Sequence, residues 1–445
     1  MSEAYIQGIR RNWKQFLLQL VMVFAVGLTM GAERTVVPIM GEETFGIESF
    51  LIIGSFVISF GIVKAVLNLF SGRWGDAYGR KPILILGWVA AIPIPIVLIY
   101  APSWWWIAAA NVLLGVNQGV TWSMTQISKL ELAGPSERGL AAGLDEALGY
   151  SGVALGAWLT GVLAAQYSLR PEPFYGLAFV IVVAILLAVV LVEETLPYAQ
   201  AEAAADGGTE QPTGEDPADG DEERTDGGVD DARNDADLTF GEIVKRATYG
   251  DRTLFAAAQA GHVEKFVDTL VWIAFPLYLA AEGLGVDAIG LVVGVHSAAY
   301  FLQIYTGRLA DRWGRKPPIV AGMFVAGAGT FGVVLVDSLL GYLAMSAVAG
   351  IGMALHYPNL ITVASDAAHP LWRSTGLGVY RLWRDLGYAV GAVLIGLSVD
   401  VLSIEIAFYV TAVAMFVSGG YVLVGMDETH PEFGDHESVA AAGAD

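Results

Sequence analysis

An eleven-residue phrase occurs twice in this chain, and each copy stands between two long apolar stretches. The copies are residues 72–82, GRWGDAYGRKP, and residues 307–317, GRLADRWGRKP, which agree at 7 of 11 positions and lie 235 residues apart. At the same offset, Gly115 corresponds to Gly350. We therefore expect the chain to be a duplication of one structural unit. The glycines, the acid and the basic cluster predict a tight turn in each copy.

The apolar stretches around these phrases are long enough to cross about 30 Å of hydrocarbon as helices. The chain is 55% hydrophobic and only 16% charged, with a mean hydropathy of +0.56, so that its solvent is mostly lipid. We predict an all-α integral membrane protein with twelve transmembrane helices. Six of them form a bundle in residues 1–193 and six form an equivalent bundle in residues 251–426.

The repeated phrase resembles the signature of the major facilitator superfamily (MFS) of transporters, which lies between helices 2 and 3 and again between helices 8 and 9. The resemblance implies the MFS fold of two parallel repeats, which rock about a central site to give alternating access. It also implies that the signature acid lies against a helix start in the opposite bundle, and that the basic residues bind acids at neighbouring helix ends. These contacts would lock the outward-open form. The basic residues alone could be ordinary positively charged residues of a cytoplasmic loop.

We expect the lock to use both signature copies and one acid near the end of a neighbouring helix in each half. The residues are Gly72, Asp76, Gly79, Arg80, Lys81, Gly307, Asp311, Gly314, Arg315, Lys316, Glu131 and Asp366.

The formal net charge of −21 belongs mainly to two segments. Residues 193–237 contain 16 acids and two arginines, and residues 427–445 contain 6 acids and no Lys or Arg. We interpret residues 194–237 as an acidic disordered cytoplasmic linker and residues 427–445 as an acidic cytoplasmic tail. Residues 238–250 form either an interfacial helix or an extension of helix 7. Basic residues in the short connections place both termini in the cytoplasm of a multi-pass cell-membrane protein.

The chain contains no cysteine, which excludes disulfides, thiolate metal sites and cysteine nucleophiles. No motif supports enzymatic catalysis, and we expect no cofactor, no metal and no nucleic-acid partner. The expected partners are a small-molecule substrate, protons as the coupling ion and the lipid bilayer. We expect the protein to be a monomer.

Charges within the spans are the candidates for coupling, because each one costs about 2.5–3.5 kcal/mol near the bilayer centre unless it has a partner or faces a cavity. We assign coupling first to Glu264 and Asp268 of helix 7, and then to Asp145 and Glu146 of helix 5. On helix 7, spacing permits Lys265 to pair with Asp268. The alternative is that such groups only hold helices together.

Helix 11 carries Arg381, Arg384 and Asp385, and its spacing predicts an Arg381–Asp385 pair that leaves Arg384 over. Acids of helix 5 are expected to face the helix 11 cations across the two bundles. For Arg34 and Lys64, an anion-binding role competes with snorkelling to the interface. For the polar groups of helices 4 and 10, a pocket role competes with interhelical contacts. The candidate substrate-binding residues are Arg34, Asn117, Gln118, Trp122, His262, His356, Tyr357, Arg381, Arg384 and Asp385.

The sequence therefore predicts a secondary active transporter, by symport or antiport, for a small organic solute. The cations of helix 11 and Arg34 favour a polar or anionic solute, and protons are the expected coupling ion. A proton-coupled multidrug efflux antiporter is the alternative, although helix 4 has Asn111 where such exporters usually carry an arginine. A different class is a non-transporting receptor or sensor built on the same fold.

Overall fold

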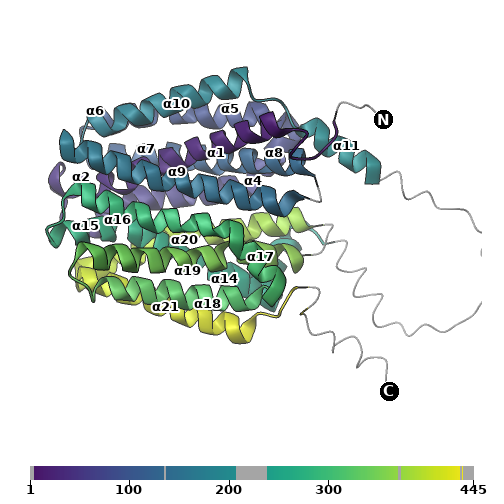
Figure 1. Ribbon diagram of the computed structural model, residues 1–445. Coiled ribbons are helices and arrows are strands. Elements are labelled where there is room, and N and C mark those ends of the chain that lie inside the picture. Colours follow the sequence, from purple (N-terminus) through teal and green to yellow (C-terminus); the bar gives the residue numbers. More distant parts are fainter. Residues whose placement is uncertain (1–4, 135–136, 207–237, 369–371, 431–432, 434–445) are drawn as a thin grey trace, which may run out of the picture.

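The protein is described here by a computed structural model, which covers residues 5–134, 137–206, 238–368, 372–430 and 433 (Figure 1). Within these residues the secondary structure is helical. The first six spans are α1 (Trp13–Arg34) with α2 (Val36–Glu43), α3 (Phe50–Ile53) with α4 (Ser55–Tyr78), α5 (Arg80–Ala91) with α6 (Pro93–Tyr100), α7 (Trp104–Asn117) with η1 (Gln118–Trp122) and α8 (Ser123–Ala133), α9 (Arg138–Gln166), and α10 (Glu172–Val190). The other six are α14 (Arg252–Trp272) with α15 (Ala274–Ala281), α16 (Val286–Ala298) with η4 (Ala299–Leu302) and α17 (Gln303–Trp313), α18 (Lys316–Val333), α19 (Leu339–Asp366), α20 (Arg373–Val401), and α21 (Ile404–Gly425).

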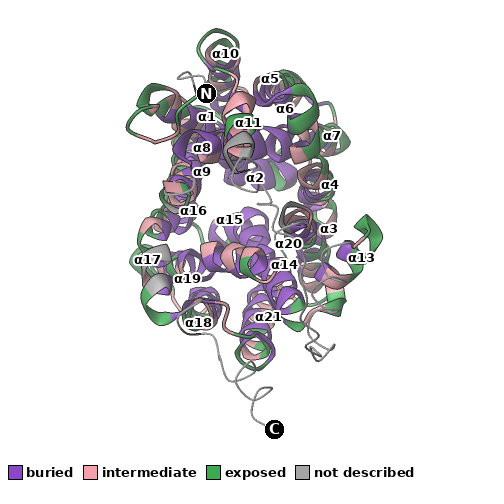
Figure 2. Ribbon diagram, turned by 90° about the vertical axis from the view of Figure 1, so that its right-hand side faces the viewer, coloured by how far each residue is buried: buried purple, intermediate pink, exposed green. Residues whose placement is uncertain are grey.

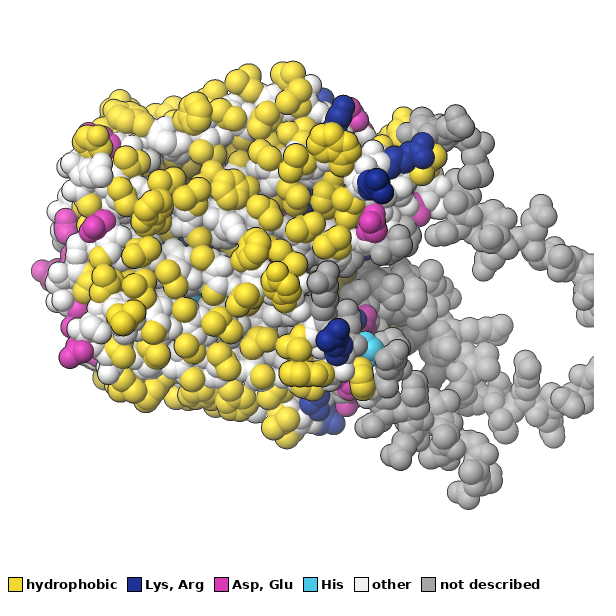
Figure 3. Space-filling model, viewed as in Figure 1, with side chains coloured by type: hydrophobic (Ala, Val, Ile, Leu, Met, Phe, Trp, Pro, Cys, Tyr) yellow, Lys and Arg dark blue, Asp and Glu magenta, His cyan; other side chains and the backbone are white. Residues whose placement is uncertain are grey.

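The two sets of six spans form two bundles that lie side by side, as Figure 2 shows along the helix axes. By length and hydropathy alone, nine of the described helical stretches qualify as membrane spans. The remaining helical stretches are interrupted or less apolar, and they bring the number of spans to twelve. Exposed apolar side chains cover the flank of the molecule, whereas charged side chains gather at its two ends (Figure 3). This distribution matches a protein whose flank is solvated by lipid.

Proline breaks the first span of each bundle at the same relative place. Pro38 follows the break at Thr35, and Pro276 follows the break at Ile273. Proline has no N–H for the carbonyl four residues earlier, and its ring crowds that carbonyl, so the helix axis changes direction there. Arg34 directly precedes the break in the first span, and Asp268 precedes the break in the seventh span by somewhat more than one helical turn.

Glycines let the helices of the first bundle approach until their backbones touch. A Cβ atom added at Gly27 would lie 1.9 Å from the carbonyl oxygen of Gly149, and one added at Gly31 would lie 2.1 Å from that of Val153. This contact joins α1 to α9, and it is the type of small-residue packing that holds membrane helices together.

The signature segments are more helical than the sequence predicted. α4 continues through Gly72 to Tyr78, and the chain turns at Gly79, where φ is +93°. In the second copy, Gly314 has a φ of +86°. The expected tight turn is therefore a single glycine in each copy, because only glycine adopts this conformation without strain.

Two other segments differ from the expectation. The connection expected to begin at Lys129 is helical as far as Ala133, since α8 extends that far. The range 194–237, interpreted as a disordered linker, begins with helix α11 (Leu196–Asp206), and residues 207–237 lie outside the described residues. Residues 238–250 contain a short helix, α13 (Phe240–Lys245), and a π-helical turn, η3 (Arg246–Gly250), and Asp251 separates them from α14. Most of the tail, residues 434–445, is not described.

The α1–α9 contact gives a first prediction. Gly31→Ala should lower the stability of the protein by about 1–3 kcal/mol, because its methyl group would overlap the backbone of α9. Thermal unfolding in detergent measures this effect. Gly176→Ala on α10 is the control, since a Cβ atom there meets nothing within 4 Å. Equal unfolding temperatures for the two variants would contradict the close α1–α9 contact.

Candidate functional site

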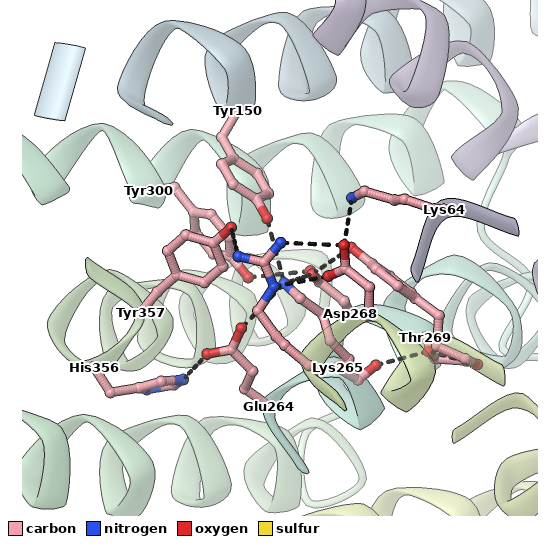
Figure 4. Close-up of polar contacts among 12 residues, drawn as sticks. Lys64, Tyr150, Glu264, Lys265, Asp268, Thr269, Tyr300, His356 and Tyr357 are labelled. Atoms are coloured by element: carbon pink, nitrogen blue, oxygen red, sulfur yellow. Dashed lines mark hydrogen bonds and ion pairs between the residues drawn. The ribbon is translucent and has the colours of Figure 1, made fainter. Parts of the chain in front are cut away.

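A buried carboxylate, Asp268, lies at the centre of the molecule and is held by groups from both bundles (Figure 4). Lys265 donates a hydrogen bond to its Oδ2 atom at 2.9 Å, and an Nη1 atom of Arg34 lies 3.6 Å from its Oδ1 atom. The hydroxyls of Tyr300 and Tyr388 donate at 3.1 and 3.0 Å. Because Arg34 belongs to α1 and Asp268 to α14, this ion pair crosses from one bundle to the other.

Arg34 is fully buried, so the snorkelling alternative is wrong for this residue. Its guanidinium carbon also lies 5.3 Å from the ring centre of Trp272, in cation–π range. Trp272 in turn packs edge-on against Phe56 and Phe60, with ring centres 5.6 and 4.9 Å apart. These aromatic rings fill the space between the bundles on the side of Arg34 that faces away from the signature turns.

Glu264 lies one turn before Asp268, and it is buried within the second bundle. Its Oε1 atom is 3.2 Å from the Lys265 ammonium, and its Oε2 atom is 3.2 Å from Nε2 of His356 (Figure 4). The other ring nitrogen of His356 lies 2.9 Å from the carbonyl oxygen of Gly352. Lys265 therefore connects Glu264 with Asp268. The helical spacing predicted the Lys265–Asp268 pair.

A second charged contact crosses the bundles at Asp385 of α20. Lys64 of α4 lies 3.7 Å from its Oδ2 atom, and the Asn68 amide donates a hydrogen bond to the same oxygen. Arg384 donates to both carboxylate oxygens, at 2.7 and 3.1 Å. The predicted Arg381–Asp385 pair is therefore wrong. The i,i+4 spacing permitted that pair, but Arg381 points toward α8, where it donates to the Gln126 side chain.

A polar cavity lies between the bundles beside this contact, on the side nearer the signature turns. Its walls include three cations and one acid, and the aromatic rings of Trp122, Tyr150 and Tyr357. The charged lining residues are Lys64, Arg381, Arg384 and Glu146. Gln126 connects two of them, since its oxygen accepts from Arg381 and its amide nitrogen donates to Glu146 at 3.2 Å.

The polarity of the crossing ion pairs is opposite to the one expected. The first bundle supplies the cations and the second bundle supplies the acids, in the pairs Arg34–Asp268 and Lys64–Asp385. Asp145, which was expected to face cations of helix 11, instead pairs with Lys129 of its own bundle at 2.5 Å. Lys129 lies in a helix rather than in a connection, and this position brings it to Asp145.

Other candidate substrate-binding residues lie away from the cavity. Asn117 donates to the Gly87 carbonyl at 3.1 Å, and Gln118 donates to the Val26 carbonyl at 2.9 Å, so both connect helices of the first bundle. His262 lines a separate, mainly apolar cavity of about 230 Å³ with residues of α14, η3 and α20. His356 lies behind Glu264. Trp122, Tyr357, Arg381 and Arg384 remain in the central cavity wall.

The signature residues pair within their own halves. Arg80 donates to one oxygen of Glu131 at 2.9 and 2.6 Å, and Asp76 lies 2.6 Å from Arg80 with its side chain 71% exposed. In the second copy, Arg315 lies 3.6 Å from Asp366. The expected contact of Asp76 with a helix start in the opposite bundle is absent from this conformation of the described residues. The surroundings of Gly307 and the side chain of Asp311 lie outside what the structure describes.

Two residues that hold the signature turns were missed at the sequence level. A carboxylate of Glu194 accepts hydrogen bonds from the backbone N–H groups of Arg80 and Lys81 at 2.8 and 3.1 Å. Glu428 binds the N–H groups of Arg315 and Lys316 in the same way, at 2.8 and 3.0 Å. Each carboxylate thus caps the helix that follows a signature glycine. A repeated Glu-Thr pair, Glu194-Thr195 and Glu428-Thr429, was the available signal.

Comparison with known proteins identifies the family. The model of the Major Facilitator Superfamily matches residues 20–259 and 260–442. The chain belongs to the Major Facilitator Superfamily. This is the family that the signature predicted, and it is a family of multi-pass membrane transporters and not of enzymes.

Individual relatives are more distant. The chain is 29% identical over 181 residues to the inner membrane transport protein YajR of Escherichia coli K12, a match that covers 40% of this chain and 38% of YajR. It is 29% identical over 131 residues to the multidrug resistance protein MdtH of Aeromonas hydrophila, which covers 29% of this chain and 30% of MdtH. These matches span well under half of either relative.

A solved structure of the xylose transporter XylE from E. coli, in a partially occluded inward-open conformation, has the same fold. Its TM-score is 0.68 at 13% identity, and the match covers 93% of this chain and 98% of that one.

The glutamate cap of α5 gives a second prediction. Glu194→Ala should lower stability by about 0.5–2 kcal/mol, because two N–H groups at the start of α5 lose their acceptor. The neighbouring exposed residue supplies the control, Glu193→Ala, and thermal unfolding in detergent compares them. If Glu193→Ala lowered the unfolding temperature as much as Glu194→Ala, the cap would not be the cause.

Proposed function

We propose that this MFS transporter carries a small organic anion through the cavity beside Asp385, by alternating closure of its two ends. The observation that supports an anion is the environment of Arg381. This guanidinium lines the cavity, and its contact among the described residues is with Gln126, a neutral side chain. Its positive charge is therefore not matched by an ion pair, unlike those of Lys64 and Arg384. A partly buried cation of this kind attracts a negatively charged group.

The arrangement of the cavity supports a second binding contribution from aromatic rings. Tyr150 contacts Trp122 and Tyr357 edge-on, with ring centres 5.7 and 5.8 Å apart. Lys64 lies 5.8 Å from the Trp122 ring centre. A carboxylate or other anionic group would lie near Arg381, and the apolar part of the solute would lie against these rings.

Arg381→Gln should weaken anion binding about tenfold or more, because a charged hydrogen bond is replaced by a neutral one. The measurement is the thermal stabilisation of the detergent-solubilised protein by a panel of organic anions, sugars and lipophilic cations. Lys14→Gln, which removes an exposed cation of α1, is the control and should leave the stabilisation unchanged. Stabilisation by anions that survives in Arg381→Gln would contradict this assignment.

The same panel tests the runner-up function, multidrug efflux. MdtH, a partial relative, is a multidrug resistance protein, and an aromatic cavity wall with Glu146 would also suit a lipophilic cation. Stabilisation by lipophilic cations alone, lost in Glu146→Gln, would replace the anion proposal with that function. Binding of an anion without any flux in liposomes would instead favour the receptor class.

We also propose that Glu146 is the proton-coupling residue among the four candidates. Asp268 and Glu264 lie against Lys265, and Asp145 lies against Lys129. Glu146 lines the cavity and accepts from the neutral Gln126 amide, with no cation within ion-pair distance among the described residues. A carboxylate that is not fixed by a cation can exchange a proton with water in the cavity. Asp268 then serves to hold the bundles together, and Glu264 holds Lys265 within the second bundle.

Glu146→Gln should abolish substrate-driven proton movement in proteoliposomes while substrate binding persists, because glutamine keeps the Gln126 contact but cannot release a proton. A pH-sensitive dye inside the liposomes measures the proton movement. Persistence of coupled proton movement in Glu146→Gln would return the role to the acids of α14.

For the signature residues, we propose the lock role in the outward-open form, with Asp76 leaving Arg80 to reach the opposite bundle. The exposure of the Asp76 side chain in the present conformation supports this, since a solvent-exposed ion pair with Arg80 is weak and can be exchanged for another partner. The basic residues at the end that carries the signature turns (Figure 3) support a cytoplasmic position for this end and for both termini. We propose that the protein acts in the cell membrane as a monomer.

A further inference from the structure

One carboxylate ties the two bundles together at the end opposite the signature turns. Asp400 lies at the end of α20, in the second bundle, and it reaches the start of α3, in the first bundle. Its Oδ2 atom accepts from the Ser49 hydroxyl at 2.6 Å, and its Oδ1 atom accepts from the Phe50 N–H at 2.6 Å. The Leu51 N–H lies 3.2 Å from Oδ2. A negative charge at free N–H groups of a helix start is a favourable contact.

This contact stands apart from the other polar links between the bundles. Among the described residues, the remaining hydrogen bonds and ion pairs that cross the bundles lie around Asp268, Asp385 and Gln126. Those links lie at the centre or toward the signature turns. At the far end, the described residues show no hydrogen bond or ion pair between the bundles other than the three bonds of Asp400.

The internal repeat supplies a comparison within the same molecule. At an offset of 235 residues, Asp400 corresponds to Ala165 near the end of α9, which packs against α16. Within the described residues, no side-chain hydrogen bond joins α9 to α16. Instead, Gly161 and Gly290 bring the backbones together, since a Cβ atom at Gly161 would lie 2.8 Å from the Val286 carbonyl oxygen. The contact between α9 and α16 is thus closed by packing. The equivalent contact between α20 and α3 is closed in addition by the charged cap of Asp400.

We propose that Asp400 is the latch of the end opposite the signature turns: its bonds to Ser49, Phe50 and Leu51 hold that end closed and must break for it to open. The contact joins the two bundles, which separate at this end when it opens. The free energy of these bonds is therefore gained only in the closed state. The Ser49 hydroxyl also accepts from the Ile52 N–H at 3.2 Å, so α3 keeps its own cap when Asp400 leaves. Opening of this end therefore breaks the bonds of Asp400 but leaves α3 capped by Ser49.

The latch is tested by measuring how far this end is open in the absence of any substrate. The chain contains no cysteine, so that two introduced cysteines can carry spin labels without background. Suitable exposed positions are Glu43, the last residue of the first span, and Glu282, directly after the seventh. In lipid nanodiscs, Asp400→Ala should raise the ratio of open to closed distances about fivefold or more, the change expected for the loss of one helix cap.

Three further variants make the result specific. Asp400→Asn keeps one acceptor oxygen and should give an intermediate shift, and Ser49→Ala removes one donor from the other bundle and should shift the ratio in the same direction. Asp337→Ala, which removes an exposed acid at the same end of the same bundle, should change nothing. If Asp400→Ala does not fold, the first two variants still report on the contact. Unchanged distance distributions in the Asp400 and Ser49 variants would overturn the latch.

The proposal depends on the alternating closure described above, but not on the identity of the solute. The label distances are recorded without substrate, so a wrong assignment of Arg381 or Glu146 would leave this result unaffected. Conversely, an unchanged distance distribution would remove the latch and leave the anion site standing.

Discussion

The buried ion cluster around Asp268 is the interaction on which the central part of the molecule depends. One carboxylate receives a cation from each bundle and two tyrosine hydroxyls, so that no charge in the cluster lacks a partner. Removing the acid would leave Arg34 buried without an acidic partner, whereas Lys265 would keep Glu264, and an uncompensated buried charge typically costs several kcal/mol. Arg34 and Asp268 both lie in the first span of their bundle, shortly before its proline break, and their ion pair joins these two spans.

Carboxylates at helix starts recur at the ends of the molecule, with different consequences. Glu194 and Glu428 cap the helices after the signature glycines, and each cap joins two parts of the same bundle. Asp400 caps α3 from the other bundle. The same chemistry therefore strengthens each bundle internally and links the two bundles at one end. The links within a bundle can persist while the bundles rock, whereas the link between them cannot.

Much of this arrangement could be predicted from the sequence, because a long apolar stretch and a repeated phrase each have few structural solutions. The twelve spans and the family are confirmed. Arg80 lies against Glu131, and Lys265 against Asp268, where helix ends and helical spacing placed them. Spacing along one helix does not fix which side chains of another helix lie opposite, however. The Arg381–Asp385 pair was therefore wrong, and Arg34 was not recognised as an ion-pair partner of Asp268.

The missed glutamates have a different cause. Glu194 and Glu428 lie at the start of acidic segments. The composition of such a segment does not distinguish the one acid that binds a helix start from its acidic neighbours. Likewise, nothing in the sequence distinguished Asn117 and Gln118, which connect helices, from Trp122, which lines the cavity. The direction of a side chain within a helical turn depends on tertiary packing. The occurrence of several polar residues in one turn therefore does not reveal which of them face the cavity.

The polarity of the crossing ion pairs means that the two halves of this duplicated chain have become unequal partners. Cations of the first half face acids of the second in both crossing pairs. A protein assembled from two copies of the first half would place Arg34 and Lys64 opposite a half that lacks Asp268 and Asp385. Buried cations would then face one another in a medium of low dielectric constant. The divergence of these few side chains thus makes a single chain with two different halves obligatory, even though the backbone of each half still follows the common ancestral pattern.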